Sequence, residues 1–170
     1  MSDAAAAKRC EDRFFTVDDG LRLHYHDYPG DAGKPPLLCL PGLTRNARDF
    51  EDFAERYSPR FRVLAIDFRG RGASDYDPVP DRYIPPTYAQ DVIDLLDQLA
   101  IPGAIFVGTS LGGLVTMLMA IMAPQRITAA TIRSGAVIAM AMVTSPPSDV
   151  PMKMASAIPS WSSISTTSAA

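Results

Sequence analysis

One stretch constrains the fold of this chain more than any other: residues 108–113, which read Gly-Thr-Ser-Leu-Gly-Gly. It follows a short apolar run, residues 104–107, and precedes a segment without Pro or Gly, residues 114–120. A strand, a sharp turn and a helix are therefore predicted in succession. The glycines would let strand and helix approach without a Cβ clash, while the turn would hold Ser110 in a strained backbone conformation.

The chemistry that this turn suggests centres on the hydroxyl of Ser110. The turn would present this hydroxyl beside a helix N-terminus, whose partial positive charge suits a developing anion. The alternative is a purely structural glycine-rich turn. A serine nucleophile also needs a histidine and an acid, which in chains with this turn follow the serine. After Ser110 there is no histidine and the only acid is Asp149, whereas the chain's two histidines, His24 and His26, lie far upstream.

The rest of the chain alternates strand and helix patterns. Residues 14–17 and 21–28 read as a hairpin joined by Asp-Asp-Gly, a strong turn signal. Residues at helical spacing predict a helix over residues 47–57. A second helix is predicted after Thr87, because residues 87–90 read as a capping box. Short apolar runs predict the remaining strands at 37–40, 61–66, 104–107 and 127–132. The expected class is α/β, with a mostly parallel sheet and an N-terminal β-hairpin.

Three short sequence motifs each follow one of these predicted strands. Leu-Pro-Gly-Leu occupies residues 40–43, Asp-Phe-Arg-Gly-Arg-Gly-Ala-Ser occupies residues 67–74, and the serine turn follows at 108–113. Together they resemble the N-terminal half of the α/β-hydrolase superfamily, over roughly residues 13–133. Pro41 stands where many members carry a histidine. Within the second motif, the resemblance gives Asp67 and Arg69 structural roles.

The resemblance also implies roles for individual residues. Ser110 matches the nucleophile, and the backbone N–H groups of Leu43 and Leu111 match the donors of the oxyanion hole. The supporting glycines would be Gly42, Gly108 and Gly112. Superfamily members that open epoxides or remove halides use an aspartate at the turn, so a serine implies acyl transfer. The expected substrate is a small ester, lactone or activated carbon–carbon bond, with no cofactor.

The upstream histidines invite two interpretations. His24 and His26 alternate on one face of a predicted strand, and an H-x-H pair is able to bind a metal. We favour ordinary strand histidines and predict no metal. In the resembled fold three strand steps separate them from Ser110, about 14 Å across the sheet, too far for a general base. The triad histidine is therefore expected to be missing from the chain, and the triad acid stays unknown.

The distribution of charge divides the chain. We expect a flexible N-terminus over residues 1–12, a core over residues 13–133, and a low-charge tail rich in Ser, Ala and Pro over residues 134–170. This tail holds only two charged residues, Asp149 and Lys153, and is either a linker or a sequence foreign to the fold. A sheet that stops after about six strands would expose an edge, and we expect self-association through it.

Composition excludes several classes of protein. The net charge is −3 without a basic patch, which argues against nucleic-acid binding. The uncharged run 104–124 has the length of a membrane span, but its glycines favour a buried strand and helix. No secretory signal is visible, and Cys39 is expected in the core, so we predict a cytoplasmic protein.

Our leading hypothesis is a serine hydrolase that is nearly inactive as this truncated chain, and the alternative is a non-catalytic binding or regulatory protein on the same scaffold.

Overall fold

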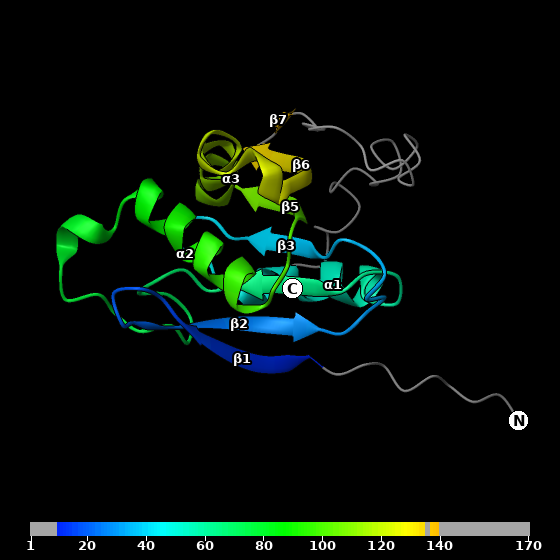
Figure 1. Cartoon of the computed structure of the whole chain (residues 1–170), viewed down its shortest axis with the longest axis horizontal. Helices are drawn as coiled ribbons and strands as arrows, with labels where there is room; N and C mark the ends of the chain where they lie inside the picture. The colour runs from blue at the N-terminus through cyan, green and yellow to red at the C-terminus, as the bar shows by residue number, and fades with distance from the viewer. Residues whose placement is uncertain (1–9, 135–136, 140–170) are drawn as a thin grey trace, which may run out of the picture.

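A single mixed sheet with helices on both faces forms the body of the molecule (Figure 1). The computed structural model describes residues 10–134 and 137–139. The seven strands are β1 (Glu11–Thr16), β2 (Arg22–Tyr28), β3 (Leu37–Leu40), β4 (Val63–Ile66), β5 (Ala104–Thr109), β6 (Ile127–Ser134) and β7 (Val137–Ala139).

The strand order is β1-β2-β4-β3-β5-β6-β7. Strands β4, β3, β5 and β6 are mutually parallel, while the β1–β2 hairpin and β7 join as antiparallel neighbours. This arrangement confirms the predicted α/β class, the mostly parallel sheet and the N-terminal hairpin. The sheet has one strand more than the six expected, because β7 adds a short antiparallel pairing to β6. Ser134, the last residue of β6, and strand β7 lie within the segment 134–170, and the other residues of that segment are outside the described residues.

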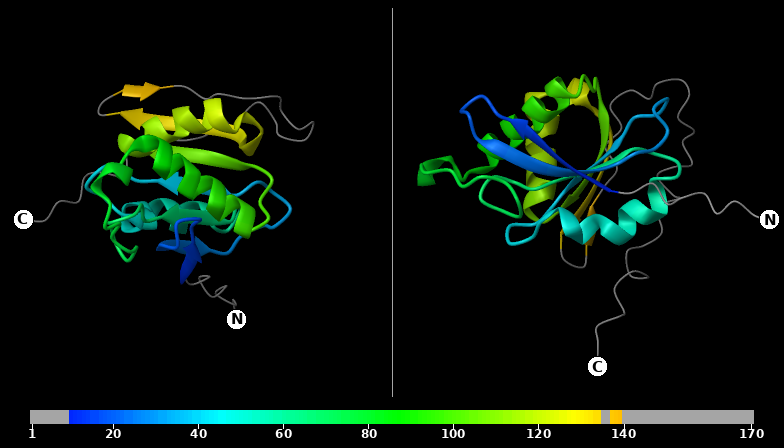
Figure 2. Two further views of the ribbon diagram at one scale, coloured as in Figure 1. Left: turned by 60° about the vertical axis from the view of Figure 1, so that its left-hand side comes forward. Right: turned by 90° about the horizontal axis from the view of Figure 1, so that it is seen from below.

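Within the described ranges, three α-helices cover the sheet: α1 (Glu51–Tyr57), α2 (Pro85–Gln98) and α3 (Leu111–Met122). Short 3₁₀ turns lie at η1 (Ala47–Phe50), η2 (Pro80–Arg82) and η3 (Pro124–Arg126). Helices α2 and α3 pack on one face of the sheet and α1 packs on the other, as the right-hand view of Figure 2 shows. None of the helices in the described part of the chain combines the length and apolar character needed to cross a membrane.

The central strands bury both of their faces, and alternate residues contribute to two separate cores. Leu38 and Phe106 point toward α2 and α3, whereas Cys39 and Val107 point toward α1. This follows from the two-residue period of a strand. Cys39 has no exposed surface, which confirms its predicted place in the core.

The start of α2 corrects one local prediction. The helix begins at Pro85, its N-cap is Ile84, and no side chain caps it, so the capping box at Thr87 is wrong. Two prolines occupy the first positions of the helix, where a missing N–H costs nothing and the fixed φ is already helical. They start the helix two residues before the threonine, which therefore lies within its first turn.

The two edge strands of the sheet, β1 and β7, each pair with only one neighbouring strand among the described residues. On the hairpin side, β1 carries Glu11 and Arg13, whose side chains form an exposed ion pair. Charges of this kind discourage pairing with another chain. On the opposite side, β7 pairs with the end of β6 through only three residues. Self-association through that edge stays a prediction.

Candidate active site

Ser110 lies between the end of β5 and the first residue of α3, as the sequence predicts. Its φ is 51° and its ψ is −110°, a conformation that non-glycine residues rarely adopt. Only Ala100 shares a positive φ among the non-glycine residues described. The Ser110 side chain is exposed at the carboxyl edge of the parallel strands. Its strained turn therefore presents the hydroxyl to solvent at a helix N-terminus.

The glycines around Ser110 allow close packing of the turn. A Cβ atom at Gly108 would lie 2.6 Å from the carbonyl oxygen of Gly112. At Gly112 it would lie 2.0 Å from the carbonyl oxygen of Leu40, and at Gly113 it would lie 2.4 Å from Cγ2 of Ile132. Real Cβ atoms do not tolerate such contacts, so larger residues would displace α3 from the sheet.

The loop that follows β3 meets the serine turn. Strands β3 and β5 are parallel neighbours, with Leu40 beside Gly108, so the segments after them emerge at the same sheet edge. A Cβ atom at Gly42 would lie 3.6 Å from the Cβ atom of Ser110. The sequence-predicted residues Gly42 and Ser110 are thus brought together. Leu43 follows in the chain, and its side chain is exposed.

Arg71 restrains this loop, a contact that the sequence did not reveal. Its Nε atom donates a hydrogen bond to the carbonyl oxygen of Leu43. Its Nη1 atom donates to the carbonyl oxygen of Arg69 at 3.1 Å and to the hydroxyl of Tyr88 at 3.3 Å. The guanidinium thereby connects the loop that follows β3 to the turn that follows β4 and to α2. Because the acceptor is a backbone group, no residue type in the sequence marks it.

Asp67 organises the turn after β4. Its Oδ1 atom accepts a hydrogen bond from the backbone N–H of Ala47 at 2.6 Å. Its Oδ2 atom accepts from the N–H of Ala73 at 2.9 Å and lies 2.8 Å from Nδ1 of His24. A Cβ atom at Gly72, where φ is 55°, would overlap this carboxylate. The interactions support the structural role expected for Asp67.

Arg69 forms a buried ion cluster with three aspartates. The guanidinium donates to the carboxylates of Asp19, Asp77 and Asp91, and Arg69 itself is 1% exposed. Burial raises the pKa of Asp91 to about 6, although the Arg69 charge acts in the opposite direction. The cluster joins the β1–β2 turn, the loop after β4 and helix α2. Its geometry supports the expected structural role of Arg69 and shows no link to the serine hydroxyl.

No imidazole stands beside Ser110 in the part of the chain that the structure describes. His24 and His26 lie on β2, three strand steps from β5, as expected. Ser110 has no side-chain hydrogen bond to any described residue, whereas His24 is bonded to Asp67. Asp149 lies outside the described residues. The site therefore brings together a strained serine, a glycine-containing loop and a helix N-terminus, and no described residue is placed to act as its general base.

Comparisons with known proteins agree with this fold. A family model described as the alpha/beta hydrolase fold matches residues 35–162. An alpha/beta hydrolase from Novosphingobium aromaticivorans is 54% identical, with a TM-score of 0.71 over 75% of this chain and 45% of that one. A hydrolase from Pseudomonas aeruginosa is 34% identical, with a TM-score of 0.65 over the same two shares.

Curated relatives match over shorter shares of their length. A 3-hydroxybutyrate-oligomer hydrolase of Cupriavidus necator is 35% identical over 56% of this chain and 33% of its own. The 3-oxoadipate enol-lactonase 2 of Acinetobacter baylyi is 35% identical over 62% of this chain and 39% of its own. Epoxide hydrolase 4 of Mus musculus is 30% identical over 75% of this chain and 34% of its own. This chain therefore spans about a third to two fifths of the length of these relatives. From the matched residues and the shared sheet, the chain belongs to the alpha/beta hydrolase fold family.

Proposed function

We propose that this chain carries the nucleophile and the oxyanion-binding backbone of a serine hydrolase. The observation that carries the proposal is the strained conformation of Ser110 at the sheet edge, with Gly42 beside it. Such strain persists only where the surrounding structure enforces it, and it is typical of active sites. We also propose a cytoplasmic location, because both cysteines are free thiols.

In the proposed reaction, Oγ of Ser110 attacks a carbonyl carbon and the carbonyl oxygen becomes an oxyanion. Backbone N–H groups of Leu43 and Leu111 would donate to it, each contributing roughly 3 kcal/mol to the transition state. The leaving alcohol departs, and water then hydrolyses the acyl-enzyme. The serine proton needs an acceptor, and the described residues place none at hydrogen-bond distance. We therefore expect acylation by this chain to be slow.

The proposed substrate is a small ester, a lactone or an activated carbon–carbon bond. Similarity to an enol-lactonase supports this class, since a lactone is a cyclic ester. Similarity to an epoxide hydrolase gives weaker support for an ester or lactone substrate than similarity to the enol-lactonase does. Opening an epoxide on a serine would leave an ether, which water does not hydrolyse readily, whereas an acyl ester on Ser110 turns over by ordinary hydrolysis.

A fluorophosphonate probe tests the assignment, because it phosphonylates activated serines. We expect slow labelling that maps to Ser110 by peptide mass spectrometry and is abolished in Ser110→Ala. The matched control is Thr44→Ala, which removes an exposed hydroxyl from the neighbouring loop and should label like the unaltered chain. Labelling that persists in a folded Ser110→Ala variant would overturn the proposal.

A further inference from the structure

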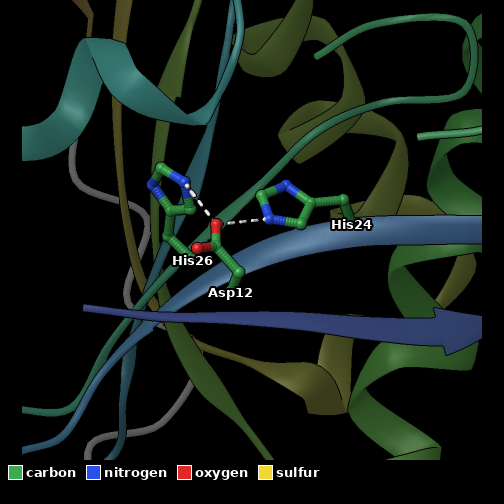
Figure 3. A group of neighbouring side chains, drawn as sticks. All are labelled: Asp12, His24 and His26. Carbon is green, nitrogen blue, oxygen red and sulfur yellow. Dashed lines mark hydrogen bonds and ion pairs between the residues drawn. The ribbon is translucent and has the colours of Figure 1, made fainter. Parts of the chain in front are cut away.

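A second group of chemically active side chains lies away from Ser110, between β1 and β2 (Figure 3). The Oδ1 atom of Asp12 lies 3.0 Å from Nε2 of His24 and 3.3 Å from Nε2 of His26. All three ligand atoms lie within 4.8 Å of one another. Among the described residues, no other group of three His, Cys, Asp or Glu side chains converges in this way.

The pairing of the two strands brings these residues together. Asp12 and His26 are direct partners in the antiparallel register, and His24 lies two residues away on the same face of β2. Diagonal neighbours on one face of an antiparallel pair are within reach of long side chains. The arrangement is thus set by backbone geometry and does not require a flexible loop to close.

The spacing of the ligand atoms suits a small metal ion. Zinc binds imidazole nitrogen at about 2.0–2.1 Å and carboxylate oxygen at about 2.0–2.2 Å. In a tetrahedron with such bonds, neighbouring ligand atoms are about 3.3 Å apart. The two measured nitrogen–oxygen separations, 3.0 and 3.3 Å, are close to this length. The two imidazole rings are nearly perpendicular, at 88°, so both nitrogens face the carboxylate without stacking.

The two ring nitrogens of His24 each face a carboxylate, an arrangement that suits a bound positive ion. Nδ1 of His24 lies 2.8 Å from Oδ2 of Asp67, while Nε2 faces Asp12. A neutral imidazole has one N–H, so donation to Asp67 leaves a lone pair on Nε2 facing a second carboxylate. A positive ion between Nε2 and the Asp12 oxygen removes this repulsion. A carboxylate that accepts a hydrogen bond from the distal nitrogen is also the usual outer partner of a metal-bound histidine.

We propose that Asp12, His24 and His26 bind one divalent transition-metal ion, with Zn²⁺ as the best fit and water in the remaining position. Two imidazoles and one carboxylate favour Zn²⁺ over Ca²⁺ or Mg²⁺, which prefer oxygen ligands. Both histidines are buried, whereas the Asp12 side chain is 74% exposed, so an ion enters from the Asp12 side. Bound metal would connect β1 to β2 and thereby hold the edge strand on the sheet.

Zinc titration against a chromophoric chelator tests this site in the full 170-residue chain. The exposed thiol of Cys10 is a competing ligand, so every protein carries Cys10→Ser. We expect one Zn²⁺ per chain, with affinity at least 10-fold weaker in Asp12→Asn and in His26→Gln. The control is Glu11→Gln, which removes the adjacent exposed carboxylate and should change affinity less than twofold.

His24 is not altered, because its bond to Asp67 ties it to the fold. Circular dichroism of the metal-free variants verifies that each is folded. Addition of Zn²⁺ should raise the melting temperature of the Cys10→Ser protein, and this rise should be lost in His26→Gln. Equal zinc affinity in Asp12→Asn, His26→Gln and the reference protein would overturn the proposal. Absence of stoichiometric binding would overturn it too.

Discussion

The backbone N–H of Gly112 donates a 3.0 Å hydrogen bond to the carbonyl oxygen of Pro41. This bond connects the first turn of α3 to the loop that follows β3. Both segments emerge at the same edge of the sheet because β3 and β5 are parallel neighbours. The distance between the serine turn and the proposed oxyanion donor at Leu43 is therefore set by the sheet. A substitution that moves α3 should therefore disturb both the serine turn and the loop that follows β3.

Gly112→Ala is expected to destabilise the fold strongly. The new Cβ atom would lie 2.0 Å from the carbonyl oxygen of Leu40, and this backbone atom cannot rotate away. We expect a loss of about 3 kcal/mol in the free energy of unfolding, measured by urea denaturation. The control is Gly33→Ala, where the only close atom is Oδ1 of the Asp31 side chain, at 3.2 Å. An equal effect at both positions would contradict the packing argument.

Arg71→Met should slow labelling of Ser110 without unfolding the chain. The substitution keeps an apolar stem but removes the hydrogen bond to the Leu43 carbonyl. The proposed oxyanion donor at Leu43 then loses its restraint, and we expect roughly a 10-fold lower rate with the fluorophosphonate probe. Arg48→Met, which removes an exposed guanidinium from the neighbouring η1 turn, serves as the control. An unchanged rate in Arg71→Met would show that the loop is positioned without this side chain.

The sequence predicted the positions of the central strands and the serine turn well, because local features determine them. The first strand was misplaced, since β1 begins at Glu11, inside the segment 1–12 that was expected to be flexible. Apolar runs bounded by Gly and Pro located β3 and β5, and the glycine spacing located the turn at Ser110. The start of α2 was wrong, since the capping-box pattern at Thr87 ignored the stronger constraint of the prolines before it.

Contacts that depend on tertiary structure could not be predicted from the sequence. The bond from Arg71 to a backbone carbonyl has no residue signature at the acceptor. The convergence of Asp12 with His24 and His26 requires the register of β1 against β2. From the sequence, the two histidines were interpreted as ordinary strand residues, and no metal was predicted. A hairpin register assigned from the Asp-Asp-Gly turn is the one signal that would have revealed Asp12.

Removal of the Arg69 charge should cost far more stability than removal of an exposed one. Arg69→Met removes the cation that contacts the buried carboxylates of Asp77 and Asp91, and leaves Asp77 only the more distant Arg82, at 3.8 Å. Breaking a buried ion cluster in this way typically costs about 3–5 kcal/mol. Arg45→Met breaks an exposed pair with Asp49 and should cost no more than about 1 kcal/mol. Thermal unfolding of both variants measures the difference, and similar melting temperatures would refute it.

Asp91 should give stability a characteristic pH dependence. Burial raises its pKa in the folded chain to about 6, from the ordinary carboxyl value of 3.8. Between these values the folded state retains a proton that the unfolded state has released, so the contribution of Asp91 falls as pH rises from 4 to 7. The expected change is roughly 2–3 kcal/mol. Asp91→Asn should remove this fall, as measured by urea denaturation across the range. An identical pH profile in the variant would contradict the assignment.

Turnover of a simple ester by the chain itself should be close to the uncatalysed rate. The proposed nucleophile Ser110 has no imidazole beside it among the described residues, and three strand steps separate β5 from the histidines of β2. Loss of triad members from a serine hydrolase typically lowers the rate by about 10⁴- to 10⁶-fold, and the oxyanion hole supplies what remains. We therefore expect hydrolysis of p-nitrophenyl acetate barely above the buffer rate, with little further change in Ser110→Ala or His26→Ala. Stopped-flow absorbance measures both the initial burst and the steady rate. Robust turnover that requires both Ser110 and His26 would show that an upstream histidine reaches the serine, which the strand order argues against.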